Sequence, residues 1–251
     1  MLLELENVSF SYKEKKIFSH INFSYSHNDC NILCILGKNG AGKSTLLRCL
    51  CAHEKFEGSI KLNGKSVFSY TLRDLAKNIA YIPQKSFDFA FRVLDVVLMG
   101  RVPWIGYFSN PGKKDIEIAL KNMEFLNILH LKDKNYLELS GGEQQMVMLA
   151  SALTQESKVL VLDEPSAHLD FGNIQYFLKI ILELSKNKKI IMSTHSPEHA
   201  LILKAFVLVL EQERYYYGKA QEIITSKNMS NLYKISIEIL KHKNSYSIFA
   251  I

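Results

Sequence analysis

The chain has 251 residues, of which 47% are hydrophobic and 22% are charged, and its formal net charge is +6. These proportions are close to those of globular proteins and exclude disordered, fibrous and collagen-like chains. At roughly 100 to 200 residues per domain, the length predicts one large domain or a core with an inserted subdomain.

The distribution of the positive charge favours a solvated surface over a nucleic-acid-binding face. The 31 basic residues are mostly lysines in short, scattered clusters, and lysine reads nucleic-acid bases less well than arginine. We therefore expect no nucleic-acid partner. A weak attraction to an anionic membrane surface stays an alternative.

Several features indicate a reducing, cytoplasmic compartment. No run approaches the roughly 18 to 20 apolar residues of a membrane-spanning helix, and the N-terminus lacks the pattern of a secretory signal. Four cysteines in apolar contexts are expected to be reduced packing residues, and we expect no metal site at Cys49, Cys51 and His53, which lack a fourth ligand nearby. The cysteines are Cys30, Cys34, Cys49 and Cys51.

The predicted elements begin with strands. Alternating apolar and polar residues from Leu2 to Leu36 predict two or three antiparallel strands, and the final apolar run, Ile32 to Leu36, is typical of a buried strand. A glycine-rich loop and a helix over 43–51 follow, and further strands are predicted at 59–62 and 79–82.

The middle of the chain predicts an inserted helical subdomain. Apolar residues recur at helical spacing over 113–129, and a second helix over 143–153 follows a pair of glycines. Strand and helix then alternate, which implies a parallel sheet, and beyond Tyr217 we expect two short helices and a possible final strand. The alternating elements are a strand at 159–162, a helix at 174–184, and strands at 190–192 and 206–210.

The loop after the buried strand has the pattern G-x-x-x-x-G-K-[ST] of a phosphate-binding loop, and it lies between a strand and a helix, as that motif must. Its glycines let the backbone aim N–H groups at phosphate oxygens beside the positive end of the helix. The lysine supplies a cation for the β- and γ-phosphates, and the serine hydroxyl suits Mg²⁺. The nucleotide-binding residues are Gly37, Lys38, Asn39, Gly40, Ala41, Gly42, Lys43, Ser44 and Thr45.

Two carboxylates follow the predicted buried strand at 159–162, at the end where open α/β sheets bind ligands. Asp163 would hold Mg²⁺, commonly through water, and Glu164 would polarise the water that attacks in phosphoryl transfer. The alternative is that an acidic residue here caps a helix.

Residues 139–143, Leu-Ser-Gly-Gly-Glu, open a predicted helix and offer N–H groups and a hydroxyl to a second anion. This segment resembles the LSGGQ signature of the ATP-binding subunits of ABC transporters. The resemblance implies a homodimer that binds ATP and Mg²⁺, in which the signature of one copy closes over the ATP held by the other. The signature residues in this pocket would be Ser140, Gly141, Gly142 and Glu143.

Further positions fit the same family. The resemblance implies that Tyr12 stacks on adenine, although packing on a strand is an equal alternative. Gln84 matches the Q-loop, whose amide reaches Mg²⁺ and the attacking water, with an ordinary surface glutamine as the alternative. His195 matches the H-loop histidine, which contacts the γ-phosphate and helps position the water and Glu164, with a capping or core histidine as the alternative.

The segment after Glu164 resembles the D-loop, which runs along the dimer interface in the family. It comprises residues 166–170, and its last residue, Asp170, could also cap a helix. Two positions depart from the family: Gln144 replaces a common Arg, which leaves its partner open, and Ser166 replaces a common Thr, which keeps the hydroxyl.

The family implies an α/β fold: a P-loop NTPase core of ABC ATPase type with an N-terminal antiparallel β-subdomain and an inserted helical subdomain. A single domain would cover 1–251. Its β-subdomain and RecA-like core would lie at 1–84 and 156–251, and its helical subdomain at 85–155.

One segment resembles the helical subdomain of the ATPases of importers for iron–siderophore, haem, vitamin B12 and molybdate. It comprises residues 96–101, 103 and 106–108, and residues 169–173 resemble the same branch of the family. The resemblance implies a peripheral subunit on the cytoplasmic face of the inner membrane, an integral membrane permease partner and, indirectly, a periplasmic or lipoprotein substrate-binding protein. Aromatic residues that would either contact the permease or lie in the core are Phe87, Phe89, Phe91, Trp104 and Tyr107.

Two rival functions are less favoured. A soluble ABC ATPase acting on nucleic acid or ribosomes would carry a long coiled coil or a second cassette, whereas about a hundred residues without sustained heptads separate Lys43 from Ser140. A non-hydrolysing interaction module would lack Glu164 or His195, and both are present. ATP hydrolysis that drives a separate membrane channel is the leading hypothesis.

Overall fold

The computed structural model describes residues 3–26, 30–84, 90–105, 109–167, 169–211, 214–242 and 245–251. The chain forms two compact units: unit 1 comprises Met1–Ser69 and Ile181–Ile251, and unit 2 comprises Tyr70–Ile180. The narrower helical subdomain expected at 85–155 stays a prediction.

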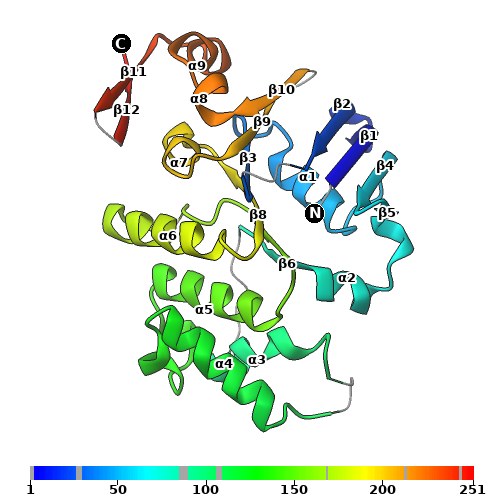
Figure 1. Ribbon diagram of the computed structural model, residues 1–251, viewed down its shortest axis with the longest axis vertical. Coiled ribbons are helices and arrows are strands. Elements are labelled where there is room, and N and C mark those ends of the chain that lie inside the picture. Colours follow the sequence, from blue (N-terminus) through cyan, green and yellow to red (C-terminus); the bar gives the residue numbers. More distant parts are fainter. Residues whose placement is uncertain are drawn as a thin grey trace. The chain divides into compact units, whose positions relative to one another are not determined.

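The N-terminal part of unit 1 is an antiparallel sheet in the strand order β2-β1-β4-β5 (Figure 1). Strand β1 (Leu3–Tyr12) pairs with β2 (Lys15–Tyr25) and with β4 (Glu57–Leu62), which in turn pairs with β5 (Lys65–Ser66). Leu3 and Leu5 of β1 are buried, as the alternating pattern predicts. A register shift between Leu5 and Val8, where Asn7 has φ of 52°, allows Val8 and Phe10 to be buried as well. The predicted antiparallel β-subdomain is confirmed.

A parallel sheet in unit 1 carries the glycine-rich loop. Strand β3 (Ile32–Leu36) pairs in parallel with β8 (Lys189–Thr194) and with β9 (Phe206–Glu211), and β10 (Arg214–Lys219) adds to β9 in the antiparallel direction. Every residue of β3 is buried, which explains its unbroken apolar run. Helix α1 (Lys43–Leu50) follows the loop.

The cysteines of unit 1 are packing residues, as predicted. Cys34, Cys49 and Cys51 are buried, and Cys30 is partly buried. Burial raises the pKa of the Cys49 thiol to about 12, so this side chain stays protonated and apolar.

The C-terminal tail belongs to unit 1 and contains the two predicted short helices, followed by a hairpin (Figure 1). The sequence predicted one final strand, but β11 and β12 pair as an antiparallel hairpin. Both strands are largely exposed, so their residues do not show the regular apolar alternation that marks a half-buried strand in a sequence. The elements of the tail are α8 (Ala220–Ile223), α9 (Ser226–Tyr233), β11 (Ile237–His242) and β12 (Ser245–Ala250), and the other elements of unit 1 are η1 (Val67–Ser69) and α7 (Pro197–Ile202).

Unit 2 combines two parallel strands with helices. Strand β6 (Ile79–Ile82) pairs with β7 (Val159–Leu162), and helices α3 (Val93–Leu98) and α4 (Lys113–Phe125) both pack on α5 (Gly141–Thr154). The other elements are α2 (Leu72–Asn78), η2 (Met99–Arg101), η3 (Leu129–Leu131), η4 (Tyr136–Glu138) and α6 (Phe171–Leu184), within which the boundary between the units falls.

Local backbone chemistry shifts two helix ends from their predicted positions. Helix α4 ends before the predicted residue 129 because Asn127 adopts a left-handed conformation, with φ of 57°. Helix α6 begins before 174 because the Asp170 Oδ1 accepts the Asn173 N–H at 2.8 Å. The capping role predicted as one alternative for Asp170 is therefore confirmed.

A buried arginine joins the helical segments of unit 2. Arg101 is 5% exposed, and it donates from Nε to Asp115 Oδ1 at 2.8 Å and from Nη1 to Glu156 Oε2 at 2.6 Å. The guanidinium holds the pKa of Asp115 below its usual value. At the preceding residue, Gly100, a Cβ would overlap the Ser151 carbonyl oxygen, so η2 packs directly on the backbone of α5.

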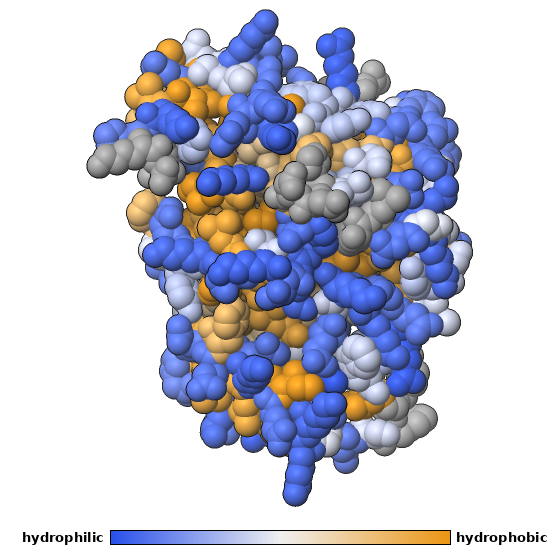
Figure 2. Space-filling view, viewed as in Figure 1, coloured by the Kyte–Doolittle hydropathy of each residue, from blue (hydrophilic) through white to orange (hydrophobic). Residues whose placement is uncertain are grey.

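The face shown in Figure 2 carries hydrophilic side chains over much of its area, with apolar side chains between them. Among the described residues, no helix combines the length and the apolar character that crossing a lipid bilayer requires.

Replacing Arg101 by Ala should lower the free energy of unfolding by about 3 kcal/mol, because the change leaves the largely buried Asp115 carboxylate without its cation. Chemical denaturation followed by circular dichroism measures this loss. As a matched control, Arg92→Ala removes an ion pair whose side chains are 48% and 47% exposed, and should leave stability almost unchanged. Equal losses in the two variants would contradict the assignment.

Candidate functional site

The glycine-rich loop of unit 1 is a tight turn that excludes larger residues. Gly40 and Gly42 have φ of +79° and +94°, conformations that residues with side chains rarely adopt. A Cβ at Gly42 would lie 2.7 Å from Ile17 Cγ2, and one at Gly37 would lie 2.6 Å from the Leu210 carbonyl oxygen. Both the turn and the close approach of β2 and β9 therefore require glycine.

The Lys43 ammonium lies over this loop. Its Nζ donates to the carbonyl oxygens of Gly37 at 3.0 Å and Lys38 at 3.3 Å, and the residue is 4% exposed. Helix α1 is preceded by Gly42, which has no side chain to cap the first N–H groups. Ser44 and Thr45 follow in the first turn. A buried cation beside a helix start without a side-chain cap fits the phosphates of a nucleotide.

Tyr12 lies at the end of β1, in the same unit as the loop. Its hydroxyl accepts from Arg48 Nη2 at 2.8 Å and donates to Glu54 Oε1 at 3.3 Å, and its ring meets that of Phe10 edge-on at 4.7 Å. The residue is 41% exposed. The polar contacts fix the ring while part of it stays accessible, and its stacking on adenine stays a prediction.

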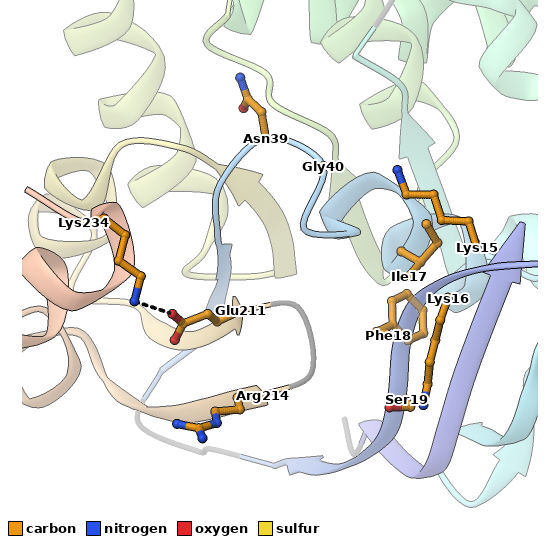
Figure 3. A pocket seen from close by; sticks show the side chains of 10 residues that line it. All are labelled: Lys15, Lys16, Ile17, Phe18, Ser19, Asn39, Gly40, Glu211, Arg214 and Lys234. Carbon is orange, nitrogen blue, oxygen red and sulfur yellow. Dashed lines mark ion pairs between the residues drawn. The ribbon is translucent and has the colours of Figure 1, made fainter.

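A cavity of about 660 Å³ lies beside the tip of the loop, at Asn39 and Gly40 (Figure 3). Its charged lining is mainly cationic, which favours an anionic ligand. Figure 3 shows the Lys15 side chain extending on the side of Gly40, while Lys234 pairs with Glu211 at 3.9 Å. The charged lining residues are Lys15, Lys16, Glu211, Arg214 and Lys234. Sequence reasoning missed them because they come from three separate segments.

His195 follows β8 in unit 1 and is exposed. On the preceding residue, the Thr194 Oγ1 accepts the Ser196 N–H at 3.1 Å and lies 3.1 Å from His199 Nδ1. Burial, with a smaller contribution from His195, lowers the pKa of His199 to about 4. His199 is therefore a neutral core histidine, whereas His195 is not in the core.

In unit 2, the parallel pairing of β6 and β7 brings residues that follow the two strands to the same edge. Gln84 Nε2 donates to Glu164 Oε2 at 3.1 Å. Asp163 is 3% exposed and accepts from the Tyr81 hydroxyl at 3.4 Å. Tyr81 was not predicted, although its place in the strand before Gln84 offered a signal.

The backbone at Glu164 is unusual, with φ of 45°. A left-handed conformation at a residue other than glycine costs energy and is often found at functional sites. Helix α6 is capped by Asp170, so Asp163 and Glu164 do not serve as its N-cap. Gln84 likewise has a specific partner, unlike an ordinary surface glutamine.

The signature segment, also in unit 2, starts α5 with a capping box. Ser140 Oγ accepts the Glu143 N–H at 3.4 Å, and Glu143 Oε2 accepts from the Ser140 N–H at 2.9 Å and from its hydroxyl at 2.7 Å. These hydrogen bonds hold the pKa of Glu143 below its usual value. The glutamate at this position therefore orders the helix start, where Ser140 and Gly141 are exposed.

Gln144 and Gly142, at or beside the signature, each contact another segment of unit 2. The Gln144 side chain donates to the Tyr136 carbonyl at 3.2 Å, which supplies the partner that the sequence left open. A Cβ at Gly142 would lie 3.4 Å from Leu169 Cδ2, so the signature contacts the segment that resembles a D-loop.

The aromatic candidates for partner contact are only partly described. Phe91 is 53% exposed and Trp104 is 41% exposed, so neither is a core residue. Phe87, Phe89 and Tyr107, together with Gly106, Phe108 and the D-loop residue His168, lie outside the described residues.

Comparisons with known proteins agree with these motifs. The family model described as "ABC transporter" matches residues 19–167. The chain is 34% identical to the molybdate import ATP-binding protein MolC of Haemophilus influenzae, over 93% of this chain and 88% of the relative. It is 36% identical to a probable iron chelatin transport ATP-binding protein of Helicobacter pylori, over the whole of both chains.

A solved structure is also similar along nearly the whole chain. It comes from a transporter assigned to the metal-chelate type, in an inward-facing conformation, with a TM-score of 0.84 and 31% identity over 99% of this chain and 96% of that one. This likeness confirms the α/β fold of ABC ATPase type predicted from the sequence.

The buried His199 predicts how stability depends on pH. Its folded pKa of about 4 lies below the ordinary value near 6.5, so between these values the unfolded chain binds a proton that the folded chain does not. The contribution is complete above about pH 6.5 and falls by about 3 kcal/mol as the pH drops to about 4.

Urea titrations at a series of pH values measure this slope. His199→Asn should flatten the change between pH 6.5 and 4, whereas His130→Asn, at an exposed position, should leave it as in the wild type. The same slope in His199→Asn as in the wild type would refute the assignment.

Proposed function

This chain belongs to the ABC transporter family of ATP-binding subunits, and from that premise we propose that it powers the uptake of a metal chelate through a separate membrane permease. Hydrolysis of ATP is the activity of this family. The candidate cargoes are iron–siderophore, haem, cobalamin and molybdate-like anions. The support for import is the similarity, over nearly the whole chain, to subunits named for molybdate import and iron chelatin transport.

The observation that carries the ATPase mechanism is the hydrogen bond from Gln84 to Glu164, which lies next to the buried Asp163. The Gln84 amide donates to Glu164 and holds its carboxylate in position to orient a water molecule for attack on the γ-phosphate. Glu164 then acts as the general base for that water. His195 contacts the γ-phosphate and limits the movement of the same water.

The phosphate loop binds the nucleotide in this mechanism. The Lys43 ammonium, which now donates to two loop carbonyls, exchanges these neutral acceptors for β- and γ-phosphate oxygens, and charge-assisted hydrogen bonds are the stronger ones. Loop N–H groups and the start of α1 hold the remaining charge, and Tyr12 stacks on the adenine. The oxygens of Ser44, Gln84 and Asp163 suit Mg²⁺, which would neutralise phosphate charge.

Two copies of the chain complete each site in this proposal. The signature at the start of α5 is exposed at Ser140 and Gly141, and its 14-residue helix directs N–H groups outward. Ser140, Gly141, Gly142 and Glu143 of one copy then close over the ATP held by the partner's loop. The Ser140 hydroxyl turns from Glu143 toward the phosphate when the copies close.

The subunit works on the cytoplasmic face of the inner membrane, bound to its permease. Exposed Phe91 and Trp104 in unit 2 supply apolar surface for that contact. A periplasmic or lipoprotein substrate-binding protein would deliver cargo on the far side without touching this chain. The alternative, a soluble ABC ATPase that acts on nucleic acid or ribosomes, predicts stimulation by RNA or DNA instead.

Glu164→Gln should keep MgATP binding and lower steady-state hydrolysis about 100-fold or more, because it preserves shape and removes the charge that orients water. Gel filtration with ATP should show a trapped dimer. Glu183→Gln, at an exposed position on α6, serves as the control and should hydrolyse ATP normally. Undiminished hydrolysis by Glu164→Gln would refute the role of this residue.

Lys43→Ala should instead weaken ATP binding in calorimetry at least tenfold.

Proteoliposomes with the permease and binding protein of the same transport system test the proposed import. ATP inside the vesicles should drive accumulation of a labelled ferric chelate or molybdate with the wild type and not with Glu164→Gln. If neither cargo accumulates and RNA or DNA raises the ATPase rate severalfold, the soluble alternative is favoured.

A further inference from the structure

The C-terminal tail contacts the backbone of the histidine that the proposed mechanism places at the γ-phosphate. Tyr233, the last residue of α9, donates its hydroxyl proton to the His195 carbonyl oxygen at 2.9 Å. Burial raises the pKa of Tyr233 to about 12, so its hydroxyl keeps the proton and remains a donor at neutral pH. This bond joins two segments that lie far apart in the sequence.

The tail contacts the same segment at a second point. Helix α7 begins two residues after His195, and in its first turn Glu198 Oε1 accepts the Ile248 N–H of β12 at 3.0 Å. Strand β12 packs on α7 over several residues. The segment around His195 thus contacts both α9 and the terminal hairpin.

The end of α9 also contacts the sheet that carries the phosphate loop. The next residue, Lys234, takes a left-handed conformation with φ of 61° and pairs with Glu211 at the end of β9. Figure 3 shows this pair in the cavity whose lining also includes Asn39 of the loop. Strand β9 pairs with β3, the strand that leads into the loop. Helix α9 therefore contacts both the His195 backbone, through Tyr233, and the sheet that carries the loop, through Lys234.

We propose that Tyr233 is a positioning residue for His195, and that the C-terminal tail is in this way part of the ATPase site. The proposal rests on the function proposed above for His195. His195 is exposed and follows the last residue of a strand, so its backbone needs an anchor if the imidazole is to stay at one place. A small displacement of a catalytic group lowers a rate without weakening ground-state binding.

The direct test is Tyr233→Phe, which removes the donor and keeps the ring. We expect kcat for ATP hydrolysis to fall about three- to tenfold, the effect of losing one hydrogen bond, while KM for MgATP stays within about twofold. The matched control is Tyr217→Phe on β10, where the ring packs against Phe23 and the residue is 45% exposed. Its kcat and its thermal midpoint should equal those of the wild type.

A double-mutant cycle separates positioning from a general structural role. In the His195→Ala background, Tyr233→Phe should cause no further loss in single-turnover rate, because no imidazole remains to be placed. The same fold loss in both backgrounds, or a rise in KM with kcat unchanged, would overturn the proposal.

The cycle also distinguishes this inference from the function on which it rests. If His195→Ala hydrolyses ATP at the wild-type rate, the role of His195 fails, and the inference fails with it. If His195→Ala is impaired while Tyr233→Phe behaves like the wild type, the inference alone is overturned. A thermal midpoint of Tyr233→Phe within a few degrees of the control ensures that the comparison concerns folded protein.

Discussion

The turn between β3 and α1 is the constraint on which the rest of unit 1 depends. Its backbone passes so close to Ile17 and to the Leu210 carbonyl that no side chain fits at Gly42 or Gly37. That tight path leaves carbonyl oxygens under the Lys43 ammonium and places an uncapped helix start beside them. The strands around the turn therefore act mainly to hold a cationic, glycine-lined surface in one shape.

In unit 2, the pairing of two parallel strands positions the polar side chains of the candidate site. Parallel pairing of β6 with β7 fixes where both strands end, and this register lets Gln84 reach Glu164. The left-handed backbone conformation at Glu164 is energetically unfavourable, and the surrounding strand pairing stabilises it. Farther along the chain, Arg101 joins the helical segments of unit 2, and the Ser140–Glu143 capping box orders the start of α5, which carries the signature. Polar contacts thus support each group whose chemistry is proposed.

The His195 segment shows how residues outside recognised motifs can contribute to a site. Thr194 and Tyr233 bond to the backbone at or next to this histidine, and Glu198, in the helix that follows it, accepts the Ile248 N–H of β12. Two of these three contacts involve the tail, whose role was not visible in its sequence. A terminal segment with weak apolar alternation can therefore act through single hydrogen bonds to a loop elsewhere in the fold.

The family, the phosphate loop, the strands β3 and β7 and the helices that follow glycines could be predicted from the amino-acid sequence, because these depend on short spacings and on backbone angles that only certain residues adopt. The sequence also allowed two interpretations of Asp170, which the capping bond to Asn173 confirmed in part. The terminal hairpin, the partner of Gln144 and the contact of Tyr233 with His195 became visible only in the folded chain. Hydrogen bonds between residues distant in the chain leave no periodic pattern in the sequence, since packing of the whole unit brings their atoms together.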